Sequence, residues 1–358
     1  MNNTNVKPRL QWVDTAKGIC ILLVILYHTT EHIMDLCPAI RDMLRAARMP
    51  LYYTIAGLFV SVKNPKVFLN KKFNRLVIPF CFFVLLGDLG GYLTSIADGT
   101  DFTYFSPLYY AITEDTDRKF FNPPIWFLIS LLDVYIIYMF IERIAKHAGK
   151  YDTLLKMALA LLAGFCGIRC NRMCIDLPFF IDTSLTAFPF FIFGHIMMTK
   201  TDILKKNYSG HTYLILSVIL IGIALLTANG DIEYYRNNIR ATVFHTYVPG
   251  VLGSTGLLLL AKAIGSIPVI TNIGRYSIVY LGTHYLFFRE LKEIFEPILG
   301  PRHEIGLDVL TFSSTVVLSA ISCWLLLKSV PCLVAQKDAV HFIRFAKIME
   351  GSCNDTTE

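Results

Sequence analysis

Apolar residues gather along this chain into runs of roughly 20 residues, and shorter stretches between the runs carry most of the charge. A helix needs about 20 apolar residues to cross the hydrocarbon core of a bilayer, so each run predicts one membrane-spanning helix. The predicted spans are residues 12–30, 49–62 (extended backwards), 76–97, 124–141, 153–169, 178–198, 212–228, 242–261, 271–288 and 308–327. Because the second and fifth are short, eight or eleven spans are also compatible with the pattern. The predicted fold class is all-α, a polytopic membrane helical bundle of about ten transmembrane helices.

The composition supports this class. Of the 358 residues, 54% are hydrophobic and 17% are charged, whereas a soluble domain carries about a quarter charged residues. The net charge of +6 comes with no dense basic run, so we expect the lipid bilayer as a partner and no nucleic acid. No repeat or separate soluble domain is evident. We expect a membrane domain over residues 1–335, followed by a cytoplasmic C-terminal tail over residues 336–358.

Basic residues are denser in every second connecting segment. Under the positive-inside rule, this alternation places the N-terminus and the C-terminus in the cytoplasm. Residues 1–9 are polar and the first run has no typical cleavage site, so we expect it to remain as an anchor. On the other side, the long acidic and aromatic loop 98–122 is a candidate binding element. Residues 229–241 and 289–307 are candidate walls of an outer vestibule.

Ionisable residues inside the first apolar run distinguish it from the others. Lys17 and His28 are eleven residues apart, so a helix places them on nearly the same face and about 16 Å apart along its axis. An ionisable group at membrane depth costs about 2.5–3.5 kcal/mol on insertion scales and usually faces a cavity or a partner. His28 is therefore a functional candidate, and the alternative is a histidine that hydrogen-bonds between helices as part of their packing.

Two groups of basic residues are further candidates. Arg41, Arg45 and Arg48 have the i, i+4, i+7 spacing of one helical stripe. This stripe is compatible with an anionic substrate, with lipid phosphates or with pairing to nearby aspartates. Lys72 and Arg75 share a helical face before the third span. They would clamp a phosphate group, or else set the topology and contact anionic lipid.

Two single residues inside or at the ends of spans complete the candidates. Trp126 opens the fourth span, where a tryptophan of the interfacial belt is the simplest interpretation. His284 is the second histidine well inside a span, and on its own it is a weak signal.

Three cysteines, Cys166, Cys170 and Cys174, have the spacing of one helical face. A metal site would need histidines or closely spaced CxxC pairs, which are missing there. Helix packing is therefore the preferred interpretation, and a disulfide or metal site is the alternative.

In their order along the chain, these motifs resemble those of the acyltransferase 3 family of integral membrane acyltransferases, particularly its fucose-4-O-acetylase-like members. The resemblance covers nearly the whole chain, through about residue 330. The matching residues are Lys17 and His28 with ten residues between them, Pro50-Leu51-Tyr52, Lys72 and Arg75, Trp126-Phe127-Leu128, and Gly274, Ser277, Tyr280, Leu281 and His284. In two departures, Ala56 replaces the family's serine before glycine, and lysine replaces arginine at positions 17 and 72. The lysines keep the charge but weaken bidentate contact.

The resemblance implies transfer of an acyl group, usually acetyl from acetyl-CoA, to a carbohydrate hydroxyl of a cell-envelope glycan or related sugar. A sugar hydroxyl is a poor nucleophile at neutral pH, and histidine is well suited to act as its general base. We expect His28 to take the hydroxyl proton and Glu31 to orient or relay it. A histidine that first accepts the acyl group is the variant mechanism. Acetyl-CoA would be a co-substrate, and no metal is expected.

The remaining candidates take roles on the same basis. Lys17, Lys72 and Arg75 would hold the CoA phosphates at the cytosolic end of the site. The acceptor-binding candidates are Arg41, Arg45, Arg48, Trp126 and His284. The expected location is the bacterial inner (cytoplasmic) membrane.

Two other classes of function compete with an enzyme. A transporter or flippase for a sugar or lipid-linked glycan would use the same intramembrane polar groups as a translocation path. Its typical mark is a pair of Gly- or Pro-broken helices in two related halves, and the sequence shows no such symmetry. A sensor or scaffold without turnover has no specific feature in its favour.

Overall fold

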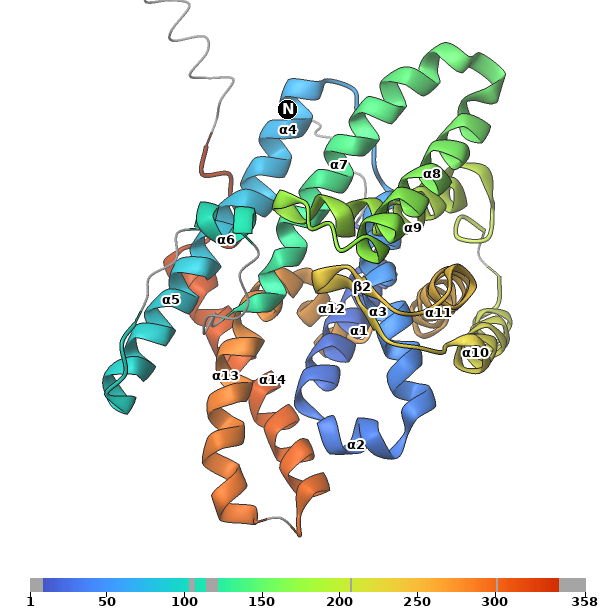
Figure 1. Ribbon diagram of the computed structural model, residues 1–358. Helices are drawn as coiled ribbons and strands as arrows, with labels where there is room; N and C mark the ends of the chain where they lie inside the picture. Colours follow the sequence, from blue (N-terminus) through green and yellow to red (C-terminus); the bar gives the residue numbers. More distant parts are fainter. Residues whose placement is uncertain (1–8, 103–106, 114–121, 207, 301, 341–358) are drawn as a thin grey trace, which may run out of the picture.

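The computed structural model shows a bundle of α-helices (Figure 1), which confirms the expected all-α class. The described residues are 9–102, 107–113, 122–206, 208–300 and 302–340. Seven helical segments among them are long and apolar enough to cross a membrane, and one of these, Pro123–Arg172, contains two long helices. Within the described residues, the strands are β1 (Ile232–Glu233) and β2 (Asn238–Ile239), which form an antiparallel hairpin.

A long helix corresponds to each predicted span. These helices are α1 (Gln11–Thr29), α3 (Pro38–Leu58), α5 (Ile78–Asp98), α7 (Trp126–Ala145), α8 (Asp152–Arg172), α9 (Ile181–Lys200), α10 (Gly210–Thr227), α11 (Val243–Ile264), α13 (Ser277–Leu299) and α14 (Glu304–Ser329). The shorter helices are α2 (Glu31–Leu36), α4 (Pro65–Lys72), α6 (Pro107–Thr113) and α12 (Pro268–Arg275). The π-helical segment η1 (Phe73–Val77) joins α4 to α5. The 3-10 turns are η2 (Pro123–Ile125), η3 (Lys146–Tyr151), η4 (Pro178–Phe180) and η5 (Tyr234–Arg236).

The helix with the arginine stripe begins well before the second apolar run, in line with the predicted backward extension of that span. The apolar pattern indicated a span over 49–62, whereas α3 starts at Pro38 and ends at Leu58. Its first half carries the three arginines, and because these residues are charged, this half does not form an apolar run. Pro38 at the first helical position favours a helix start there, because that position needs no backbone donor.

The ninth predicted span is both interrupted and extended. The path over 271–288 breaks at Tyr276, between α12 and α13, and α13 then continues to Leu299. Most of the segment 289–307, a candidate vestibule wall, therefore belongs to α13 and α14 rather than to a connection between two spans. Its glutamates, lysine and arginine are strong helix formers, although they are too polar for an apolar run. The two helices pack together as a hairpin that projects from the bundle (orange in Figure 1).

Glycines let the helices that carry the candidate residues approach their neighbours closely. A Cβ on Gly57 of α3 would lie 2.0 Å from the Phe191 carbonyl oxygen of α9. Reciprocally, a Cβ on Gly194 of α9 would lie 2.1 Å from the Thr54 carbonyl oxygen of α3. Gly274 of α12 packs in the same way against the backbone of α1. Such contacts on small residues are typical of helix packing in membranes, and they hold α1 and α3 in place.

The described chain ends beside α4. Residues 330–340 follow α14 and run along α4 and η1 (red in Figure 1), where they hydrogen-bond to Asn74. Residues 341–358 of the predicted tail lie outside the described residues. The same is true of much of the predicted binding loop 98–122, of which α6 is described.

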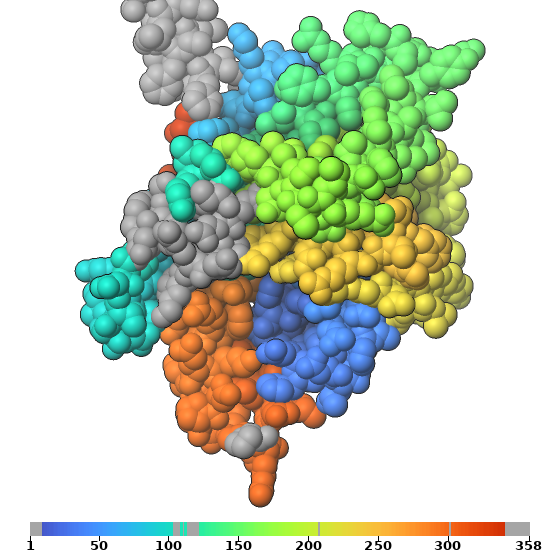
Figure 2. Space-filling view, viewed as in Figure 1, coloured from blue at the N-terminus to red at the C-terminus, as the bar shows by residue number. Residues whose placement is uncertain are grey.

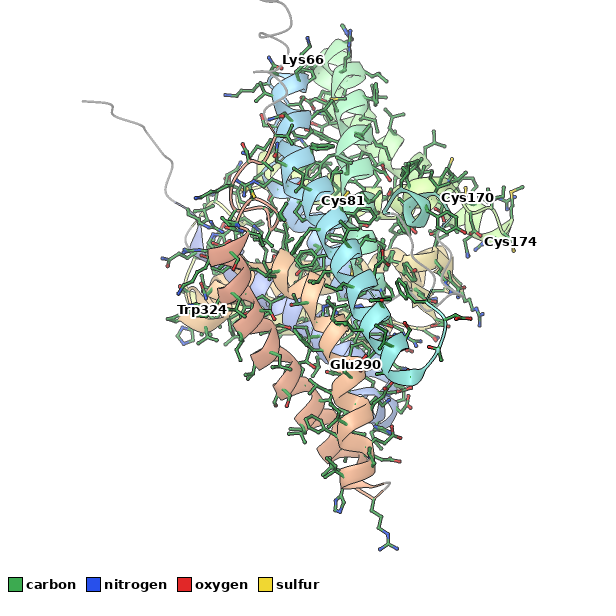
Figure 3. The ribbon with its side chains drawn as sticks, turned by 90° about the vertical axis from the view of Figure 1, so that its left-hand side faces the viewer. Lys66, Cys81, Cys170, Cys174, Glu290 and Trp324 are labelled. Atoms are coloured by element: carbon green, nitrogen blue, oxygen red, sulfur yellow. The ribbon has the colours of Figure 1, made fainter. Side chains whose placement is uncertain are left out.

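The three cysteines near the end of α8 do not form a packed face. Cys166 and Cys174 are exposed, and Cys170 and Cys174 lie at an edge of the molecule (Figure 3). Cys174 also follows the end of α8 and has a φ of 53°, so it leaves the helical face. The predicted packing role is therefore wrong for Cys166 and Cys174.

Candidate active site

One continuous helix, α1, carries both Lys17 and His28. Near its start, Asp14 accepts a hydrogen bond from the Arg9 guanidinium at 2.9 Å and lies 3.8 Å from Lys17 Nζ. At its end, the hydroxyl groups of the two threonines after His28 donate to carbonyl oxygens of the last turn. The rise per residue of an unbroken helix then sets the separation of Lys17 and His28 at about 16 Å.

His28 lies in the wall of a cavity of about 480 Å³, which we call the histidine cavity. The walls come from α1, α3, α13, the start of α7 and the β1–β2 hairpin. They include Tyr27, His28, Arg45, Arg48, Met49, Trp126, residues 231–236, Leu281, Tyr285 and Phe288. The hairpin residues belong to the segment 229–241, predicted as a wall of an outer vestibule, and residues 231–236 of it line this cavity. In Figure 2 the same segment is part of the gold band between green α8–α9 and blue α1–α3.

Aromatic and imidazole rings surround His28. The ring centroid of His284 lies 5.6 Å from that of His28, that of Tyr285 at 5.9 Å, and that of nearly parallel Phe288 at 6.2 Å. His28 is half-buried, whereas His284 is fully buried. His284 Nδ1 donates to the Tyr280 carbonyl oxygen at 2.9 Å, and its Nε2 has no hydrogen-bond partner among the described residues. His284 thus lies behind His28 rather than in the wall of the histidine cavity.

The three arginines of α3 differ in their partners. Arg41 Nη1 donates to Asp35 at 2.7 Å, and Arg45 Nη1 donates to Asp231 of the hairpin at 2.6 Å. Pairing with nearby aspartates, one of the alternatives for this stripe, is therefore observed for Arg41, whereas Arg45 pairs with a distant aspartate. Arg45 links the hairpin to α3 across the histidine cavity.

Arg48 has no carboxylate partner within the described part of the chain. Its guanidinium carbon lies 3.5 Å from the centroid of the Tyr27 ring, a cation–π contact. Its Nη1 is buried and makes no hydrogen bond to the described residues. Arg48 therefore lines the histidine cavity with donor capacity that no described residue uses.

The residues after α1 are tied to the α13–α14 hairpin. Lys292 Nζ donates to Glu31 at 2.9 Å, and this bond holds the pKa of the Glu31 carboxyl below its usual range. His32 Nδ1 lies 2.9 Å from the Asp308 carboxylate, and this hydrogen bond raises the pKa of His32. Glu31 shares a smaller cavity of about 220 Å³ with His28 and Arg41. Glu31 is thus near His28 but exposed and paired with a lysine, so its role stays a prediction.

Trp126 and the hairpin form the aromatic side of the histidine cavity. Trp126 is buried, and its ring centroid lies 6.0 Å from that of Tyr235. Asn237 holds the hairpin in place, because its Nδ2 donates to the Gly167 carbonyl at 2.8 Å and its Oδ1 accepts from Thr186 at 2.8 Å. Asn237 also takes a φ of 47°, a conformation that asparagine tolerates better than most residues.

A second cavity of about 380 Å³ lies towards the other end of α1. Its walls carry a set of basic side chains, and we call it the basic cavity: Arg9, Lys17, Lys72, Arg75 and Arg275. The structure therefore brings the three residues predicted to hold CoA phosphates into one cavity.

The motif of Lys72 and Arg75 lies where α4 becomes η1. A π-helical turn inside a helix is rare and often marks a functional site. Lys72 Nζ lies 3.2 Å from the centroid of the Tyr135 ring. Arg75 Nη1 donates to the Ala335 carbonyl, and its Nε is buried without a partner among the described residues. An unpartnered guanidinium nitrogen beside lysines fits a phosphate oxygen.

The two cavities are neighbours. Leu281 of α13 lines both. Adjacent residues of α7 divide between them, since Trp126 lines the histidine cavity and Phe127 the basic cavity. On α3, Met49 lines the first cavity and Tyr52 the second. A layer of side chains around Leu281 thus separates the basic cavity from the cavity of His28.

Several wall residues are not marked as site candidates by the sequence motifs. They are Tyr135, Arg275 and Gln336 in the basic cavity, and Tyr285 and Phe288 in the histidine cavity. Phe288 comes four positions after the second intramembrane histidine, so helical spacing was a usable signal for it. Gln336 has no such local signal, because only tertiary packing brings it to the site.

One comparison with known proteins gives a match. A family model described as an acyltransferase domain, that of acyltransferase 3, matches residues 10–328. The chain belongs to the acyltransferase 3 family. The comparison with curated proteins gave no match, and neither did the comparison with solved structures. Since the matched region contains the long apolar helices, the protein is a membrane acyltransferase.

Proposed function

We propose that this membrane acyltransferase moves an acetyl group from acetyl-CoA to a hydroxyl group of a cell-envelope glycan or related sugar. The observation that carries the proposal is the position of α1 along two adjoining cavities. Lys17 lines the basic cavity, His28 lines the histidine cavity, and Leu281 lies in both walls. A donor held by its phosphates in the basic cavity would have to pass the layer around Leu281 to bring its thioester to the imidazole, which lies about 16 Å from Lys17 along α1.

The basic cavity supports an anionic donor. Lys17, Lys72 and Arg75 approach it from two separate parts of the chain, and the Arg75 Nε has no partner among the described residues. Charge-assisted hydrogen bonds to phosphate contribute about 1.5–3 kcal/mol each. We assign these three side chains to the phosphates of CoA.

The histidine cavity supports a carbohydrate acceptor. Ligand sites combine aromatic and apolar walls with a few placed polar groups. Here Trp126, Tyr235 and Phe288 supply rings, while Arg45 and Arg48 supply donors to ring and hydroxyl oxygens. Arg41 lies in the smaller adjoining cavity and would contact the acceptor only at its edge.

The proposed reaction is a direct transfer. His28 removes the proton of the acceptor hydroxyl while that oxygen attacks the thioester carbonyl carbon. A C–O ester bond forms, the C–S bond breaks, and the proton passes to the leaving sulfur to give the free thiol. Arg48, with its unpartnered Nη1, donates to the carbonyl oxygen as negative charge develops there.

The orientation follows from the basic cavity. Its walls include Arg9 near the start of the chain and Gln336 near the end. We place this cavity and both termini on the cytoplasmic side of a bacterial inner membrane, because acetyl-CoA is cytosolic and basic segments favour that side.

A labelled-donor assay tests the proposal. Purified full-length protein in detergent receives acetyl-labelled acetyl-CoA and a cell-envelope glycan fraction, and both label transfer and release of free thiol are measured. We expect transfer by the wild type and a rate lowered about 10²- to 10⁴-fold in His28→Ala, the usual contribution of a general base. The matched control is His147→Ala, since His147 is exposed on η3.

Two results would contradict the proposal. One is full activity in a folded His28→Ala variant. The other is uptake of glycan by reconstituted vesicles without any consumption of the thioester, which would favour the transporter alternative.

A further inference from the structure

The segment that follows α14 forms part of the basic cavity. Val334 and Ala335 are buried, and Ala335 and Gln336 lie in the cavity wall with Lys17 and Arg75. The match to the acyltransferase family model ends at residue 328, so this segment lies outside the matched region.

Asn74 holds this segment in place. It is fully buried, and its side-chain amide makes four hydrogen bonds. Oδ1 accepts from the backbone nitrogens of Ala339 at 2.7 Å and Val340 at 2.8 Å. Nδ2 donates to the carbonyl oxygens of Val340 at 2.8 Å and Asn70 at 2.9 Å. The amide thus uses its whole hydrogen-bonding capacity, mostly on the backbone of the C-terminal segment.

Neighbouring side chains of this helical turn contact two different parts of the protein. Asn74 binds the segment, while its neighbours Lys72 and Arg75 line the basic cavity. Arg75 belongs to both environments, because its Nη1 donates to the Ala335 carbonyl and its Nε stays unpartnered among the described residues. The hydrogen bond to Ala335 therefore fixes the direction in which the Arg75 guanidinium faces the cavity.

We propose that residues 331–340 are a structural part of the donor site. Asn74 is the positioning residue that holds them there, and Gln336 supplies a polar side chain to the donor. This inference rests on the assignment of the basic cavity to CoA. If the segment were only a cover for the helix ends, its loss would lower stability but leave donor affinity unchanged.

Binding of coenzyme A itself, measured by calorimetry on purified protein in detergent, tests the inference. A chain that ends at Val330 lacks the segment, whereas a control chain that ends at Val340 keeps it. We expect the Kd for coenzyme A to rise roughly tenfold or more in the shorter chain, the effect of losing about one charge-assisted contact. The control chain should match the full-length protein.

Point variants decide the question where the shorter chain does not fold. Asn74→Ala should also raise the Kd for coenzyme A. Gln336→Ala should raise it several-fold, whereas Lys337→Ala, an exposed neighbour, should not. Unchanged affinity in folded Asn74→Ala and Gln336→Ala would overturn this inference and leave the proposed function intact. Absence of coenzyme A binding by the full-length protein would overturn both.

Discussion

The imidazole rings of His28 on α1 and His284 on α13 lie side by side, with their centroids 5.6 Å apart. Because a carbonyl oxygen only accepts, the bond from His284 to Tyr280 places a proton on Nδ1. Nε2 of a neutral His284 is then a bare acceptor, buried and unpartnered among the described residues. His284 is suited to support His28 when His28 takes up a proton, rather than to bind acceptor directly.

Replacement of His284 by phenylalanine keeps a ring but removes this acceptor. A hydrogen bond to a charged group contributes about 1.5–3 kcal/mol, so kcat should fall roughly 10- to 100-fold. The KM values for both substrates should change little, and His284→Gln, which restores an acceptor, should recover part of the rate. Steady-state kinetics of the purified variants measure this. An equal loss in His284→Gln and His284→Phe would indicate a packing role only.

Charge removal in the basic cavity should weaken donor binding. Lys72→Ala and Arg75→Ala each remove one contact to phosphate, and the KM for acetyl-CoA should rise roughly 10- to 100-fold. Lys71→Ala is the matched control, because Lys71 is adjacent but exposed and does not line the cavity. Initial rates at varied acetyl-CoA concentration check the effect. A similar KM in all three variants would rule out phosphate binding at this motif.

The crossing of α3 and α9 should tolerate no side chain at Gly57. A methyl group there would meet the Phe191 carbonyl at 2.0 Å, so Gly57→Ala should lower the free energy of unfolding by about 1–3 kcal/mol. Gly90 of α5 has nothing within 4 Å of its Cβ position, so Gly90→Ala should be neutral or slightly stabilising. Thermal unfolding in detergent compares the two variants. Equal Tm values would show that the helices can separate at little cost.

The pair of His32 and Asp308 should make stability depend on pH. The hydrogen bond raises the pKa of His32 in the folded protein, so its stabilisation is complete below the unfolded value of about 6.5. This stabilisation is lost as the pH rises through the folded pKa. The Tm should therefore decrease from about pH 6 to pH 8, and less so in His32→Gln, which does not titrate. Parallel curves for the two proteins would contradict this assignment.

Local sequence signals predicted the long helices well and singled out Lys17 and His28 as residues of one helix. The apolar runs indicated each long helix, and the spacing of Lys17 and His28 placed both on one face, because helical periodicity is a property of consecutive residues. Apolar runs did not indicate the helical segments that carry many charged residues. The first half of α3 and the second half of α13 are helical but too polar to be seen as apolar runs.

Long-range packing explains what the sequence did not reveal. Leu281 lies in the walls of both cavities because α13 packs against α1 and against η2, the turn before α7. The side chain of Asn74 hydrogen-bonds to the backbone of residues 339 and 340, which lie 265 and 266 positions later in the chain. No periodic pattern encodes such a contact, so Gln336 could not be recognised as part of a site.

Because α1 is unbroken, it fixes both the distance and the angle between Lys17 and His28. One residue inserted between Lys17 and His28 would increase their separation along the helix by only about 1.5 Å, but it would rotate the imidazole about 100° around the helix axis. The ring would then face a different neighbour altogether. Insertions and deletions in this helix should therefore be tolerated far less than substitutions among its apolar residues.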